Sequence, residues 1–174
     1  MAGAHKSAEL VALNPMGKLP ILTDGDAVVT EACAIGLYLA DRYAAGRLAP
    51  AIDAPERATY YRWSVFAPSV IEPGSIAKAS GWQFKPSQAG WGAHDDMLRA
   101  LDTAVTGRDF LLGSTFSMAD VIFGSTVRFM LKFKMLEGSP AVLAYSERLG
   151  ARPALHRADA INAKISAEHG LPTG

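Results

Sequence analysis

Residues 14–39 constrain the fold of this chain more than any other stretch. They read Asn-Pro-Met-Gly-Lys-Leu-Pro-Ile-Leu over 14–22, Asp-Gly-Asp over 24–26 and Thr-Glu-Ala-Cys-Ala-Ile-Gly-Leu-Tyr-Leu over 30–39. Asp-Gly between two short apolar runs is a β-hairpin signal, so we expect strands at 19–23 and 27–30. Apolar residues then recur at helical spacing, which predicts a helix over 31–44. The stretch predicts a loop, a hairpin and a helix N-terminus in succession.

The remainder of the sequence predicts helices. A short helix is expected at 7–13 with Ser7 as its cap, Gly46–Asp53 is the expected linker, and further helices are expected at 54–79, 87–106, 118–136, 140–150 and 153–170. Asp53 is the expected cap of the helix that follows the linker, with Pro55 in its first turn. Pro68 and Pro73 should kink or interrupt that helix. The chain is therefore expected to be α+β and mostly helical.

Composition narrows the classes of partner. Lys plus Arg and Asp plus Glu both number 17, so the formal net charge is zero. The chain therefore has no overall positive potential that would attract nucleic acid or an anionic membrane. The N-terminus lacks an apolar signal region, and no stretch approaches the roughly 18 apolar residues of a membrane span. The four histidines have no cysteine or carboxylate at metal-ligand spacing, so no metal is expected. These features favour a cytoplasmic protein that binds neither nucleic acid nor membrane.

The motif Asn-Pro-x-Gly-Lys-x-Pro, the Thr-Glu-Ala helix start and the order of elements resemble the glutathione transferase family of bacterial type. The resemblance implies a partial thioredoxin-like, glutathione-binding piece over 1–45 and an all-α C-terminal domain over 54–174. Ser117-Met118-Ala119-Asp120 resembles the folding motif of that helical domain. There we expect Ser117 to cap a helix while the Asp120 side chain reaches back to the Ser117 N–H.

The same resemblance assigns a glutathione half-site to Lys18, Leu19, Pro20, Glu31 and Ala32. A cis bond before Pro20 is expected, which leaves the Leu19 main chain free to pair with the cysteinyl part of the tripeptide. Glu31 would pair with the glutathione ammonium, and first-turn N–H groups at Ala32 would receive the γ-glutamyl carboxylate. Many family members have Ser at the position of Ala32. Lys18 has two readings, a contact with the glycyl carboxylate or a solvated loop lysine.

Two further side-chain types each have two readings. Tyr60, Trp63 and Phe66 share one helix face, which indicates either core packing or, through Trp63 and Phe66, a hydrophobic pocket for the second substrate. Cys33 lies in the first turn of a helix, where a thiol is either a small packed group or a nucleophile.

The resemblance implies a homodimeric detoxification enzyme that conjugates its co-substrate glutathione to a small apolar electrophile. A non-catalytic glutathione-binding or dimerisation protein, and a glutathione-dependent isomerase or dehalogenase, stand as alternatives. The family carries its catalytic Tyr, Ser or Cys on an earlier β-α-β unit of about 30 residues or more. Only 13 residues precede Asn14. We therefore expect that unit to be absent, no catalytic residue in the chain, and one unpaired edge on the strand at 19–23. Two explanations for that absence stay open: the start of the sequence is misassigned, or the protein is a truncated relative of the family.

Overall fold

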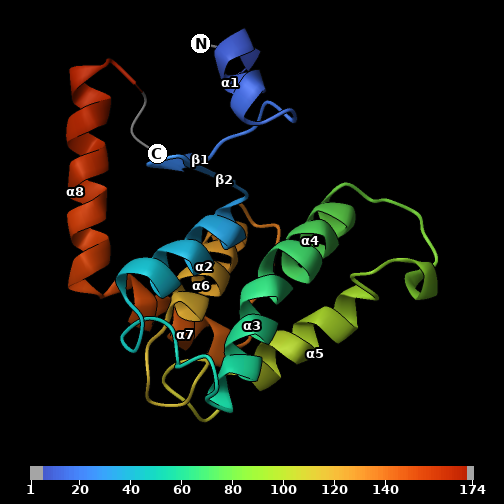
Figure 1. Cartoon of the computed structure of the whole chain (residues 1–174). Coiled ribbons are helices and arrows are strands. Elements are labelled where there is room, and N and C mark those ends of the chain that lie inside the picture. The colour runs from blue at the N-terminus through green and yellow to red at the C-terminus, as the bar shows by residue number, and fades with distance from the viewer. Residues whose placement is uncertain (1–5, 172–174) are drawn as a thin grey trace.

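A β-hairpin and a short helix lie at one end of a helical bundle, and the last helix stands along one side of it (Figure 1). The computed structural model describes residues 6–171. The elements are α1 (Ala8–Leu13), β1 (Ile21–Asp24), β2 (Ala27–Thr30), α2 (Ala32–Tyr43), α3 (Glu56–Phe66), a π-helical turn (Ala67–Ile71), α4 (Glu72–Ala79), a 3-10 turn (Pro86–Gln88), α5 (His94–Val105), α6 (Met118–Lys132), α7 (Pro140–Gly150) and α8 (Pro153–Glu168). The expected α+β, mostly helical fold is confirmed.

The hairpin forms as its local sequence predicts. Asp24 pairs with Ala27, which leaves Gly25 and Asp26 as a two-residue loop, and Gly25 has the positive φ of 58° that glycine tolerates. β1 begins at Ile21 rather than at residue 19, because Pro20 has no N–H to donate to a strand ladder. Within residues 6–171, β1 pairs with β2 alone.

The long helix expected after the linker is divided as the prolines predict. Pro68 cannot donate to the Ser64 carbonyl, and the helix widens into a π-helical turn before α4 begins. The Cys33 Sγ donates to the Ser64 carbonyl instead, at 3.3 Å. The expectation that Asp53 caps this helix was wrong, because a turn intervenes and Pro55 occupies the N-cap of α3.

Two helix boundaries differ by at least four residues from those expected. α5 begins at His94 rather than at residue 87, because Gly92 takes a φ of 69° that no helix accommodates. α6 ends at Lys132 rather than at residue 136, since Lys134 takes a φ of 57°. In both cases a residue with left-handed backbone lies two residues outside the observed end of the helix.

The core lies between α3, α5, α6 and α7. Its centre is Phe123 of α6, whose ring meets Trp63 edge-on at 5.7 Å and Tyr145 edge-on at 6.1 Å between centroids. Beneath these rings, the fully buried Asp120 accepts hydrogen bonds from the main-chain N–H of Ser117 (2.9 Å) and of Leu111 (2.8 Å). The Ser117 and Tyr145 hydroxyls also donate to it, at 3.1 and 3.0 Å. The expected hydrogen bond from the Ser117 N–H to the Asp120 side chain is confirmed.

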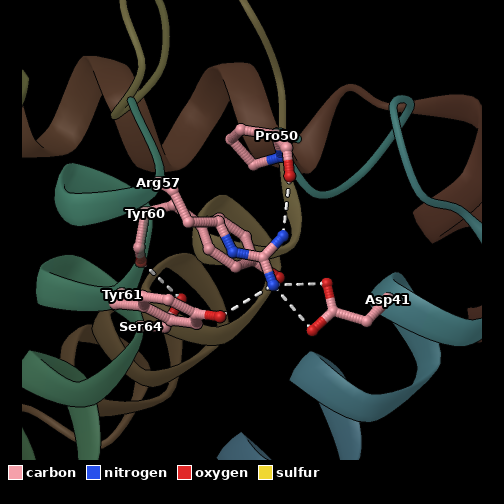
Figure 2. A network of polar contacts seen from close by, with 6 residues as sticks. All are labelled: Asp41, Pro50, Arg57, Tyr60, Tyr61 and Ser64. Atoms are coloured by element: carbon pink, nitrogen blue, oxygen red, sulfur yellow. Dashed lines mark hydrogen bonds and ion pairs between the residues drawn. The ribbon is translucent and has the colours of Figure 1, made fainter. Parts of the chain in front are cut away.

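A polar cluster joins the hairpin-bearing part to the bundle (Figure 2). Arg57 of α3 donates to Asp41 of α2, to the Pro50 carbonyl in the linker and to the Tyr61 hydroxyl. The Arg57 side chain is almost fully buried, so α2, the linker and α3 are held at one point. No helix within residues 6–171 has the length and apolar character needed to cross a membrane.

Candidate functional site

The hairpin register brings two separate segments of the chain together. Ile21 pairs with Thr30, so Pro20 and Glu31 come next to each other at the end of the ladder. The Leu19–Pro20 peptide bond is cis, as the sequence context predicts. Leu19 is 61% exposed, and among residues 6–171 its N–H and C=O have no hydrogen-bond partner. The Leu19 main chain is therefore free to pair with an extended peptide.

Asn14 holds the loop that presents Leu19. It is 4% exposed, its Nδ2 donates to the Lys18 carbonyl at 2.9 Å, and its Oδ1 accepts from the Met16 N–H at 3.1 Å. From the sequence, Asn14 is the first residue of the Asn-Pro-x-Gly-Lys-x-Pro motif, and no contact was assigned to its side chain. The signal that could have identified it is the tendency of Asn side chains to bond the main chain two residues on.

The N-terminus of α2 faces solvent beside this loop. Glu31 is its N-cap, with φ 68° and ψ 119°, and the Glu31 side chain makes no capping hydrogen bond. Such a conformation in a non-glycine residue costs about 1–3 kcal/mol, and residues of this kind gather at functional sites. Glu31 and Ala32 are both exposed. The first-turn N–H groups of α2 lack acceptors within the helix, which suits an anion.

Cys33 lies next in the same turn but faces inward. Its thiol donates to the Ser64 carbonyl, and burial raises its pKa above the ordinary value, so it stays protonated near neutral pH. These contacts support the packing reading rather than the nucleophile reading. The bond also places α3 alongside the first turn of α2.

A second set of bonds fixes α2 against the hairpin. Asp24, at the end of β1, accepts from the Tyr43 and Tyr38 hydroxyls at 2.6 and 2.8 Å, and it pairs with Arg42 at 2.9 Å. Hydrogen bonds from Tyr43 and Tyr38, and the charge of Arg42, lower the pKa of Asp24. The orientation of the α2 N-terminus relative to Pro20 is thereby set from both ends of the hairpin.

The remaining expected site residues occupy different environments. Lys18 is exposed, and it forms no ion pair within the described part of the chain. Trp63 is 4% exposed and meets Phe66 edge-on at 5.2 Å, so its contacts are those of a core residue. Phe66 is half-buried, two residues beyond the Ser64 carbonyl that binds Cys33. Across residues 6–171, no three His, Cys, Asp or Glu side chains cluster as a metal site would require.

A hairpin that ends beside an exposed helix N-terminus and is joined to an all-helical domain is the architecture that the glutathione transferase resemblance predicts. Residues 1–41 match the family model described as glutathione S-transferase, N-terminal domain, and residues 86–148 match that of the C-terminal domain. Glutathione S-transferase stcT from Emericella nidulans is 30% identical over 180 residues, which cover 94% of this chain and 78% of that protein. The chain belongs to the glutathione transferase family.

Solved structures agree with this assignment. The transferase URE2P6 from Phanerochaete chrysosporium, in complex with oxidized glutathione, superposes with a TM-score of 0.75 at 29% identity, over 94% of this chain and 81% of that one. The theta class transferase from Xanthomonas axonopodis pv. citri, with glutathione bound, gives a TM-score of 0.69 at 31% identity, over 88% of this chain and 78% of that one.

Proposed function

We propose that this protein is a glutathione transferase that conjugates glutathione to a small apolar electrophile. The observation that carries the proposal is the pairing of Ile21 with Thr30, which brings the Pro20 turn and the α2 N-terminus to one place. Thiol conjugation needs the tripeptide to be held in a fixed orientation toward its acceptor. Two recognition elements at the end of one short hairpin meet that need.

Each end of the tripeptide has a partner in this arrangement. The free Leu19 main chain pairs with the cysteinyl unit, and Pro20 shapes that edge. The Glu31 carboxylate binds the ammonium group, while the N–H of Ala32 donates to the γ-glutamyl carboxylate. Lys18 is exposed on the same loop and binds the glycyl carboxylate. Ala32 lacks the hydroxyl of a serine, so this pocket has one hydrogen bond fewer for the carboxylate.

The acceptor pocket is proposed to lie over α3, because the bond from Cys33 to Ser64 sets that helix beside the α2 N-terminus. Phe66 would face the acceptor, with Trp63 supporting it from the core. We further propose that residues 1–45 act as the glutathione-binding domain, that residues 54–174 act as the helical domain, and that the enzyme is a cytoplasmic homodimer.

Steady-state conjugation of glutathione to an activated chloroarene tests the proposal. Turnover should exceed the uncatalysed background, and Glu31→Gln should raise the KM for glutathione. Asp26→Asn is the matched control, because Asp26 is an exposed acid in the loop at the opposite end of the hairpin ladder, and it should leave the KM for glutathione unchanged. Background rates from a folded chain that still binds glutathione would refute the transferase and leave a binding protein.

A further inference from the structure

An apolar cavity lies away from the proposed half-site. It is a groove of about 330 Å³ between α6, the start of α8 and the linker. Its apolar walls are Leu48, Phe116, Val121, Leu149 and Leu155. Val121 is 42% exposed although it sits on a helix whose other face is the core. The groove is the size of a small-ligand site and is lined mainly by aliphatic carbon.

Three arginines border this groove: Arg47 from the linker, Arg128 from α6 and Arg152 from the start of α8. Within residues 6–171, none of the three has a carboxylate within ion-pair distance. Asp120 also lines the groove, but it is fully buried and its oxygens accept four internal hydrogen bonds. The groove therefore has an excess of positive charge at its border.

Two of the arginines are held in place by neutral groups. The Arg152 guanidinium stacks on the Phe116 ring at 3.4 Å from its centroid, and Arg128 donates to the Ser146 carbonyl at 3.0 Å. Stacking orients a guanidinium without neutralising it, so its outer N–H groups stay available. Arg47 is exposed and lines the groove from the linker. A guanidinium binds a carboxylate through two parallel hydrogen bonds.

We infer that this groove binds an aliphatic carboxylate, with its chain against the apolar walls and its head group among Arg47, Arg128 and Arg152. The aliphatic lining favours a chain over a planar ring, because the one aromatic face, that of Phe116, is already covered by Arg152. The site shares no residue with the proposed glutathione half-site, so its occupancy does not depend on the proposed function.

Calorimetric titration with decanoate tests the site, with decanol as the uncharged probe of the same chain length. Decanoate should bind saturably, and decanol should bind at least about 10-fold more weakly, as loss of a charge-assisted pair predicts. Arg47→Met should weaken decanoate about 5- to 10-fold by the same loss. Ala158→Phe should block the groove from the exposed side of α8 and abolish decanoate binding.

Arg157→Met is the matched control, because Arg157 is exposed on α8 next to Ala158 but does not line the groove. It should leave decanoate affinity unchanged, and circular dichroism should find every variant folded. Equal affinity for decanol and decanoate would overturn the inference. So would the absence of saturable decanoate binding, or affinity unaffected by both Arg47→Met and Ala158→Phe.

Discussion

Arg57 on α3 binds Asp41 on α2 through both carboxylate oxygens, at 2.6 and 2.7 Å (Figure 2). The two side chains are 7% and 43% exposed, so the pair is closed to water on the arginine side only. The Arg57 guanidinium also lies over the Tyr61 ring, 4.7 Å from its centroid. The pair links the helix that carries the proposed half-site to the helix that begins the bundle.

Asp41→Asn should lower the free energy of unfolding by about 1–3 kcal/mol, because a charge-assisted bond is lost while Arg57 stays buried. Urea denaturation measures the loss. Asp53→Asn is the control, since Asp53 is an exposed linker acid outside this cluster. Arg57→Lys should be similarly unstable, because a lysine cannot reach Asp41, Pro50 and Tyr61 together. An Asp41→Asn protein as stable as the parent would show that the pair contributes nothing.

Ser117→Ala should destabilise the protein by about 0.5–2 kcal/mol, the usual effect of losing a helix cap. The Ser117 hydroxyl donates to Asp120 at 3.1 Å and is buried, so water cannot replace it. Thermal unfolding is the measurement, with Ser114→Ala in the exposed preceding loop as the control. Equal melting temperatures for the two variants would exclude the capping role.

Tyr60 should make the fold sensitive to alkali. Burial raises the pKa of Tyr60 to about 12, while an unfolded tyrosine titrates near 10. The unfolded chain therefore loses this proton at a lower pH than the folded chain. The stability that neutral Tyr60 contributes is complete below about pH 10 and is lost as the pH rises through 12. Burial raises the pKa of Tyr145 in the same direction.

Tyr60→Phe should reduce the fall in stability between pH 9 and 11, measured by urea denaturation at each pH. It should have little effect at pH 7, because the Tyr60 hydroxyl is buried without a partner among the described residues. Identical pH dependence in the parent and in Tyr60→Phe would contradict the assignment.

The features predictable from sequence are those specified by neighbouring residues. Asp24-Gly25 determines the hairpin, Pro68 interrupts a helix, and Ser117 with Asp120 spans a single turn. The Arg57–Asp41 pair joins residues 16 apart, and no local pattern indicates it. The predicted start of α5 at residue 87 was wrong because of a single backbone conformation. The helix does not extend back to residue 87, because the backbone of Gly92 is left-handed.

The candidate site also has features that the sequence predicts and features that only the folded chain shows. From sequence, Pro20 and Glu31 share one half-site only through the family resemblance, because strands at 19–23 and 27–30 imply a three-residue connection. The two-residue loop that pairs Ile21 with Thr30 is a property of the folded chain. The positive φ of Glu31 could not be predicted, because glutamate carries no preference for it and the surrounding fold imposes it. The role of Asn14 in holding the 14–18 loop also depends on its burial, which only the folded chain shows.

Glutathione titration followed by calorimetry tests the central claim most directly. The parent chain should bind glutathione saturably, and Ala32→Ser should bind it about 2- to 12-fold more tightly, as one added hydrogen bond predicts. Ala34→Ser, an exposed alanine on another face of the same turn, should match the parent. Absence of saturable binding, or identical affinities for the parent and Ala32→Ser, would contradict a glutathione site at the α2 N-terminus.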